Sequence, residues 1–270
     1  MTIDQYAVIG HPISHSKSPL IHTLFAEQTR QNMQYRAIEA PLDGFADTIA
    51  RLRAEGYQGC NITVPFKFEA FQLATERSER AQLAEAVNTL KFDGNTAYGD
   101  NTDGAGLVRD ITHNLGFDLR GKRVLLMGAG GAAYGVALPL LQAGAHLTIA
   151  NRTADKAIKL ADACAPFGST QGCGYEGLAG QTFDCVINAT STGLTGDLPP
   201  LPSGLFAPGA LAYDMMYGKE TPFMRFAKEH GAAQIADGLG MLVEQAAEAF
   251  FVWRGVRPET GHVLEQLRAL

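Results

Sequence analysis

The 270-residue sequence lacks several features that mark common classes of protein. It contains no run of about 18 apolar residues, so we expect no helix that spans a membrane. The N-terminus, MTIDQYAVIG, has an acid where a signal peptide carries positive charge, and its apolar run is too short for a secretion signal. We therefore expect a soluble protein of the cytoplasm.

Signatures of metal and nucleic-acid binding are missing as well. The cysteines (Cys60, Cys164, Cys173 and Cys185) form no CxxC pair, and the histidines form no HExxH cluster. We interpret the cysteines as reduced thiols and predict no metal. The formal net charge of −6 comes without any dense run of Lys and Arg, so we expect no nucleic-acid partner.

The composition is that of a globular protein, with 46% hydrophobic and 19% charged residues. Short β-branched runs alternate with helical segments, which is typical of α/β architecture with mostly parallel strands. A first strand is expected over 6–10, and Ser18 is expected to cap a helix whose first position is Pro19. Strands over 34–40 and 59–63, with a helix between them, give the chain a βαβαβ start.

The rest of the chain continues this alternation. A helix over 79–87 precedes a hairpin that turns at Asp93-Gly94. Further strands are predicted over 123–128, 146–151, 183–190 and 210–217, further helices over 132–143, 153–163, 221–230, 239–254 and 259–269, and a Pro-rich surface loop over 196–209. We predict two domains: residues 1–102, completed by 239–270, hold a small polar substrate, and residues 103–238 bind a nucleotide.

The segment GAGGAA (128–133) fits the dinucleotide-binding pattern G-x-G-x-x-G/A, with Ala133 in the third position. It stands after a predicted strand and opens a predicted helix, as that pattern requires. Gly128 permits a sharp turn, Gly130 lets a pyrophosphate approach the backbone, and the helix N-terminus offers free N–H groups to phosphates. The alternative is an ordinary Gly-rich turn.

The end of the next strand distinguishes the two nicotinamide cofactors. NAD binders place an acid there for the ribose hydroxyl, whereas this chain has Asn151-Arg152-Thr153, with Lys156 one turn later. Arg binds a 2′-phosphate in bidentate fashion and Lys adds a point charge. The alternative is that both are solvated surface cations. We predict NADP rather than NAD.

Four polar segments of the first half lie near predicted strand ends: SHSKSP (14–19), NITVPFK (61–67), AVNTL (86–90) and GDNTDG (99–104). Reducing a ketone with a nicotinamide requires a hydride on carbon and a proton on oxygen, and without a metal a side chain supplies the proton. A partly desolvated Lys beside a carboxylate does this, so Lys67 and Asp103 are the candidates. Gln245 interrupts an apolar helix face, where its amide needs either a substrate hydroxyl or a structural hydrogen bond.

Together these segments resemble the shikimate dehydrogenase family over essentially the whole chain. SHSKSP, NITVPFK, AVNT, GDNTDG, GAGGAA, NRT, INATSTG, YDMMY and ADGLGMLVEQA occur in that family's order. The family reduces 3-dehydroshikimate to shikimate with NADPH, a step in the chorismate pathway to aromatic amino acids. The resemblance implies an N-terminal α/β substrate domain and a Rossmann-type NADP-binding domain, with C-terminal helices that return to the substrate domain.

The resemblance also implies roles for individual residues. Lys67 would be the general acid/base and Asp103 its partner. Substrate contacts would come from Ser16, Ser18, Thr63, Asn88, Tyr217 and Gln245, with the two serines on the carboxylate. Cofactor contacts would come from Gly128, Ala129, Gly130, Gly131 and Ala132 at the pyrophosphate, from Asn151, Arg152, Thr153 and Lys156 at the adenosine phosphate, and from Met215 and Gly238 at the nicotinamide.

Two positions depart from the family pattern. Lys156 stands where Arg is frequent, which softens the implied preference for NADP, and Tyr134 replaces a smaller or different residue after the glycines. Two alternatives stay open. A quinate/shikimate dehydrogenase that accepts NAD is disfavoured by Asn151-Arg152, and a non-catalytic NADP-binding sensor is disfavoured because Lys67 and Asp103 are both present. We expect a small-molecule substrate and a monomer or homodimer.

Overall fold

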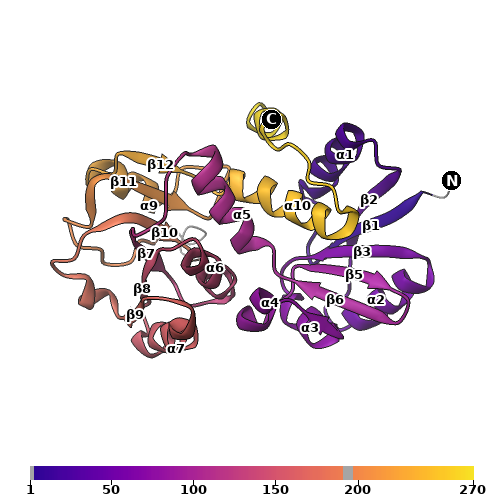
Figure 1. Cartoon of the computed structure of the whole chain (residues 1–270), viewed down its shortest axis with the longest axis horizontal. Coiled ribbons are helices and arrows are strands. Elements are labelled where there is room, and N and C mark those ends of the chain that lie inside the picture. Colours follow the sequence, from indigo (N-terminus) through magenta and orange to yellow (C-terminus); the bar gives the residue numbers. More distant parts are fainter. Residues whose placement is uncertain (1–2, 191–196) are drawn as a thin grey trace. The chain divides into compact units, whose positions relative to one another are not determined.

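The computed structural model describes residues 3–190 and 197–270, and the chain forms two compact units (Figure 1). The first unit comprises Met1–Gly106 and Val243–Leu270, and the second comprises Leu107–Leu242. The two boundaries fall inside helices α5 (Asp103–Arg109) and α10 (Leu239–Arg254), four residues beyond the breaks after residues 102 and 238 that the sequence suggested. None of the helices in the described ranges is long and apolar enough to cross a membrane.

The first unit is built on a six-stranded sheet with the order β2-β1-β3-β5-β6-β4. Its strands are β1 (Asp4–Gly10), β2 (Met33–Glu39), β3 (Tyr57–Ile62), β4 (Glu76–Arg77), β5 (Thr89–Asp93) and β6 (Thr96–Asp100). Strands β1, β2 and β3 are parallel, with α1 (Ser18–Thr29) and α2 (Phe45–Ala54) as crossovers, so the βαβαβ start is confirmed. Strands β5 and β6 form a hairpin at Gly94 (φ 52°), which makes this sheet mixed.

The end of the chain completes the core of this first unit. On one face of the sheet, Tyr6, Val8 and Tyr35 form a buried cluster with Ala249 and Trp253 of α10. The Trp253 indole Nε1 donates to the Leu90 carbonyl at 2.9 Å. Helix α11 (Gly261–Arg268) follows, and the Gln28 amide hydrogen-bonds the Glu259 carbonyl just before it. The C-terminal helices therefore return to the first unit, as the fold prediction required.

The second unit contains a fully parallel sheet with the order β12-β11-β10-β7-β8-β9. Its strands are β7 (Arg123–Met127), β8 (His146–Ala150), β9 (Thr170–Cys173), β10 (Phe183–Asn188), β11 (Phe206–Asp214) and β12 (Gln234–Ala236), with helices α6 (Gly131–Gln142), α7 (Ala154–Cys164) and α9 (Pro222–Glu229). The chain adds β8 and β9 on one side of β7 and β10 to β12 on the other. This reversal makes the carboxyl end of β7 the topological switch point of a Rossmann sheet, where ligands of such folds bind.

Several local predictions were incomplete or wrong. Helix α3 (Lys67–Leu73), the short strands β4, β9 and β12, the π-helical turn Asp110–Asn114 and the 3₁₀ turns Ala165–Phe167 and Tyr175–Leu178 were not predicted. Helix α4 (Glu79–Ala84) ends before residue 87 because Glu85 adopts a left-handed conformation with φ 49°. Strand β11 begins at Phe206, inside the predicted loop 196–209, of which residue 196 lies outside the described residues.

The predicted cap of α1 is also wrong. Lys17 is the N-cap residue, Ser18 is the first helical residue and Pro19 the second. The Ser18 N–H, one of the donors that the first turn of a helix leaves free, instead donates to the Ser16 hydroxyl at 3.2 Å. Ser18 therefore lies inside the helix, and Ser16 accepts a hydrogen bond from its N–H.

Candidate active site

The four polar segments of the first half meet at one edge of the first unit's sheet. Ile9 at the end of β1 pairs with Ile62 at the end of β3, and Asn61 pairs with Thr89 at the start of β5. Thr89 in turn pairs with Asp100 at the end of β6. The segments that leave these strands carry Ser16, Thr63, Lys67, Asn88 and Asp103, so the sheet register explains why they converge.

Lys67 and Asp103 form a short ion pair. The Lys67 ammonium Nζ donates to Asp103 Oδ2 at 2.6 Å. Lys67 is the first residue of α3 and Asp103 the first residue of α5. The side chain of Lys67 is 28% exposed and that of Asp103 is 16% exposed, so the pair is mostly buried but accessible to solvent and to a small molecule. An ammonium held in this way is a proton donor of fixed position.

Asn88 holds the other oxygen of the Asp103 carboxylate. Its amide Nδ2 donates to Asp103 Oδ1 at 2.8 Å, and its Oδ1 accepts from the Thr102 backbone N–H at 2.9 Å. A backbone N–H only donates, so this contact fixes which end of the amide faces Asp103. Asn88 is 3% exposed, and it gives the carboxylate one orientation toward Lys67.

The remaining candidates of the first unit differ in their contacts and in how deeply they are buried. Gln245 on α10 accepts long hydrogen bonds from Asn88 (3.4 Å) and Thr102 (3.5 Å) through its Oε1. Its backbone packs against Gly106 so closely that a Cβ at Gly106 would lie 2.5 Å from the Gln245 nitrogen. Thr63 and Ser16 are half-buried, and Ser18 is 9% exposed.

The Gly-rich turn of the second unit has the form that a pyrophosphate needs. Gly128 directly follows β7 and has φ 109°, a conformation that L side chains rarely adopt, and Gly130 is the N-cap of α6. No described side chain caps this helix, and a Cβ at Gly130 would meet no described atom within 4 Å. The described part of the chain therefore leaves space beside Gly130 at the N-terminus of α6. Ala133 is fully buried against the sheet, which suits the small third position of the pattern.

Two cations stand at the end of the neighbouring strand. Arg152 and Lys156 follow β8, both are exposed, and neither has an ion-pair partner among the residues that the structure describes. Asn151 donates from its side chain to the Thr153 carbonyl at 3.0 Å, which shapes the turn that carries Arg152. Positive charge without a protein partner at this position suits a 2′-phosphate.

Met215, Tyr217 and Gly238 lie at the carboxyl ends of β11 and β12. A Cβ at Gly238 would lie 2.2 Å from the Met215 carbonyl oxygen, so only glycine permits this approach. The Met215 N–H donates to the Asn188 carbonyl at 3.0 Å. Tyr217 is 40% exposed, and burial of the rest of its ring raises the pKa of its phenol. Its role toward a substrate stays a prediction. The motif INATSTG runs into residues 191–193, which lie outside the described residues.

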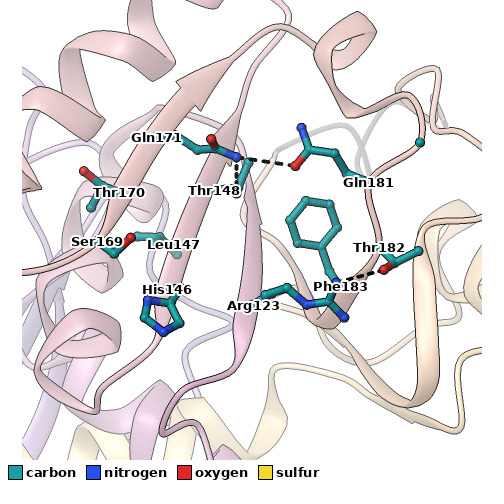
Figure 2. Close-up of a pocket in the computed structure, with 11 residues that line it drawn as sticks. Arg123, His146, Leu147, Thr148, Ser169, Thr170, Gln171, Gln181, Thr182 and Phe183 are labelled. Atoms are coloured by element: carbon teal, nitrogen blue, oxygen red, sulfur yellow. Dashed lines mark hydrogen bonds between the residues drawn. The ribbon is translucent and has the colours of Figure 1, made fainter.

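A cavity of about 370 Å³ lies at the opposite end of the second unit's sheet (Figure 2). Arg123, His146 and Phe183, at the starts of β7, β8 and β10, line it, and Gln171 donates to Thr148 at 2.9 Å across it. A second cavity, of about 620 Å³, lies in the first unit beside Arg80 and Glu248. Neither includes a predicted site residue. We assign the cofactor site to the carboxyl ends of the strands instead, because ligands of doubly wound sheets bind there.

Three buried residues that support the site were not predicted from the sequence. Thr89 and Thr102 are 0% exposed and Asn61 is 6% exposed, and all three hydrogen-bond Asn88 or its neighbours. Asn61 interrupts the apolar run GCNIT just as Asn88 interrupts AVNTL. The same signal, a polar residue inside a buried strand, was therefore available for Asn61.

The chain matches three models of one protein family. Residues 8–90 match the shikimate dehydrogenase substrate binding domain, residues 110–194 match shikimate / quinate 5-dehydrogenase, and residues 238–268 match the shikimate 5′-dehydrogenase C-terminal domain. Together these matches cover well over half of the chain.

Whole-length relatives agree with these matches. A shikimate dehydrogenase (NADP(+)) of Methylobacillus flagellatus is 62% identical over 99% of this chain and 100% of its own. The Ael1 enzyme from Pseudomonas putida is 56% identical, with a TM-score of 0.92 over 98% of each chain. The shikimate 5-dehydrogenase of Thermus thermophilus, solved in complex with NADP(H) and shikimate, is 32% identical, with a TM-score of 0.87 over 99% of each chain.

Proposed function

Because this chain belongs to the shikimate dehydrogenase family, we propose that it catalyses the reversible, NADP-dependent reduction of 3-dehydroshikimate to shikimate. The reaction belongs to the chorismate pathway, which leads to aromatic amino acids. The observation that carries the proposal is the 2.6 Å ion pair between Lys67 and Asp103 at the edge of the sheet. A positioned ammonium beside a carboxylate can give a proton to the oxygen of a ketone as it is reduced.

The second unit fits an NADP cofactor. The N-terminus of α6, which no described side chain caps, and the space beside Gly130 suit a pyrophosphate, and the exposed Arg152 and Lys156 suit a 2′-phosphate. Gly128 to Ala132 would hold the pyrophosphate, Asn151 to Lys156 the adenosine phosphate, and Met215 and Gly238 the nicotinamide. When bound, NADPH supplies the hydride.

The first unit supplies the proton. In the direction of reduction, the Lys67 Nζ–H moves to the oxygen of the substrate carbonyl, and in oxidation the neutral amine takes the hydroxyl proton back. Asp103 Oδ2 accepts a hydrogen bond from the ammonium and so directs it, while Asn88 keeps Asp103 from rotating. The ammonium and the carboxylate are therefore oriented before the proton moves, which lowers the entropic part of the activation free energy.

The substrate's polar groups have matching partners in the first unit. Ser16 and Ser18, next to the N-terminus of α1, would bind the carboxylate, since a helix N-terminus favours an anion. Thr63, Asn88 and Gln245 would bind the ring hydroxyls. These assignments rest on the position of the residues and on the family resemblance.

We also propose that the enzyme works in the cytoplasm, as a monomer or homodimer. The four cysteines are all free thiols, of which Cys60, Cys164 and Cys185 are buried, as in proteins of a reducing compartment. Burial raises the pKa of the Cys164 thiol to about 11, so this group stays protonated and unreactive at neutral pH.

The proposal is tested by oxidation of shikimate with the purified protein, followed at the absorbance band of the reduced nicotinamide, with NADP⁺ and NAD⁺ in parallel. We expect rapid reduction of NADP⁺ and little of NAD⁺. Equal efficiency with NAD⁺ would assign the protein to the quinate/shikimate branch. Failure with both cofactors, in a folded protein that binds NADPH, would leave a sensor or a different ring acid.

A further inference from the structure

A continuous chain of buried hydrogen bonds runs from β2 to the Lys67–Asp103 pair. The Tyr35 hydroxyl donates to Asn61 Oδ1 at 2.7 Å, and Asn61 Nδ2 donates to the Thr89 hydroxyl at 3.0 Å. The Thr89 hydroxyl donates to Asn88 Oδ1 at 2.9 Å, and Asn88 Nδ2 donates to Asp103 Oδ1 at 2.8 Å. Four elements of the first unit contribute to this chain, and we call it the Tyr35–Asp103 relay.

The direction of every bond in the relay is determined. Asn61 Nδ2 also lies 3.2 Å from the Asn88 backbone carbonyl, which only accepts, so this end of the Asn61 amide is the nitrogen. Thr89 Oγ1 must then accept from Asn61, and its single proton is left for Asn88 Oδ1. The Thr102 backbone N–H fixes the Asn88 amide independently and in the same sense. Each member therefore donates toward Asp103.

The members of the relay are buried, which makes each of their hydrogen bonds difficult to replace. Thr89 is 0%, Asn88 3%, and Asn61 and Tyr35 each 6% exposed, so water does not replace a lost bond. In such surroundings hydrogen bonds in one direction polarise one another, and a member left without its partner is costly. The Tyr35 ring is held as well, because it stacks on His22 at a centroid distance of 4.2 Å. The relay therefore holds the Asn88 amide in one orientation.

We propose that Asn61 and Thr89 are positioning residues of the reaction, which hold the Asn88 amide so that it fixes the Asp103 carboxylate against Lys67. The inference rests on the proposed function. Neither residue needs to contact the substrate, since both act through Asn88. The carboxylate has Lys67 on one oxygen and the relay on the other. Without the Thr89 hydroxyl, Asn88 Oδ1 keeps its bonds to Thr102 but loses one of its donors, so the amide is held less firmly and the Asp103 carboxylate is aligned less precisely with Lys67.

The deciding variant is Thr89→Val, which removes the hydroxyl and keeps the shape of the side chain. We expect kcat for shikimate oxidation to fall about 10-fold, the scale of one net hydrogen bond, with the KM for NADP⁺ unchanged. Thr89→Ser keeps the hydroxyl and should restore kcat. The matched control is Thr48→Val in α2. Thr48 is also buried, at 6%, and its hydroxyl donates to the Gly44 carbonyl one turn earlier at 2.8 Å. That variant should lose stability but keep kcat.

A double-mutant cycle separates positioning from general destabilisation. In an Asn88→Ala background, Thr89→Val has nothing left to position, so kcat should fall no further. A full additional loss in that background would overturn the inference, as would wild-type kcat in Thr89→Val alone. If Thr89→Val does not fold, Asn61→Leu breaks the preceding link and serves the same cycle. Wild-type turnover is measured in the same assay. Its absence overturns the proposed function and the positioning role together, whereas turnover that is insensitive to the relay overturns only the relay.

Discussion

Replacing Asp103 by Asn tests how the site holds its proton donor. An Asn has one oxygen where Asp has two, and both oxygens of Asp103 accept hydrogen bonds, from Lys67 Nζ at 2.6 Å and from Asn88 Nδ2 at 2.8 Å. Rotation of the new amide does not restore both bonds. In one orientation its NH₂ faces the Lys67 ammonium, and in the other it faces the Asn88 NH₂. The Thr102 N–H prevents Asn88 from turning in response. A donor therefore faces a donor in either case.

The expected loss follows from these contacts. A hydrogen bond between charged groups contributes about 1.5–3 kcal/mol, and a buried donor without an acceptor costs about 1–3 kcal/mol. Because the Lys67 and Asp103 side chains are 28% and 16% exposed, solvent screens part of this. We expect a loss of about 3 kcal/mol in transition-state stabilisation, which lowers kcat/KM for shikimate roughly 200-fold.

The assay is shikimate oxidation with saturating NADP⁺, with cofactor affinity measured separately by fluorescence titration. Affinity for NADP⁺ should stay within twofold, because Asp103 belongs to the first unit and the cofactor residues to the second. Asp47→Asn, the same change on the exposed face of α2, serves as the control and should keep full activity. An Asp103→Asn enzyme within about threefold of wild-type kcat/KM would refute the reasoning, since this difference is under 1 kcal/mol.

Three further predictions follow from the same structure. Lys67→Ala should lower turnover at least about 100-fold while NADPH binding stays nearly intact, and undiminished turnover would remove Lys67 from its role. Arg152→Gln should raise the KM for NADP⁺ roughly 10- to 100-fold, the scale of a lost charged hydrogen bond, and an equal rise for NAD⁺ would argue against a phosphate contact. Burial lowers the pKa of His22 from 6.5 to about 3, so only the unfolded chain takes up this proton below pH 6.5 and stability falls as the pH falls toward 3. Between pH 7 and pH 5, the free energy of unfolding measured with urea should therefore fall by about 2 kcal/mol more for the wild type than for His22→Phe. An equal fall for both proteins would contradict this prediction.

Much of the fold was predictable because periodicity and turn chemistry are local. Strands β7, β8 and β10 are apolar runs buried on both faces, and the glycines after β7 mark the nucleotide turn without any tertiary information. Strands β9 and β12 were missed because TQGC and QIA are short and half-polar. They are strands only because a neighbouring strand offers them hydrogen bonds. Helix α3 was missed because its seven residues, KFEAFQL, are too few to show a helical period clearly.

In the site, too, local features were predictable from the sequence and features that depend on tertiary structure were not. Lys67, Asn88 and Asp103 were identifiable because each is a polar side chain at a strand end or inside an apolar run. Their mutual orientation was not, since it depends on the register of β3, β5 and β6, which no local pattern encodes. Ser18 is the instructive error. A Ser before Pro is typical of an N-cap, yet Ser18 is the first helical residue and its own N–H donates to Ser16 two residues upstream.

The divided sequence of the first unit has a consequence for biosynthesis. The second unit is continuous from Leu107 to Leu242 and has all its residues as soon as that stretch has left the ribosome. The first unit must wait, because Ala249 and Trp253 cover the sheet face that carries Tyr6, Val8 and Tyr35. Until α10 is made, that face is an apolar surface without its cover, of the kind that aggregates or binds chaperones. Residues 243–270 therefore end this exposure during synthesis, and termination directly after Leu242 would leave the second unit complete and the sheet face of the first unit uncovered.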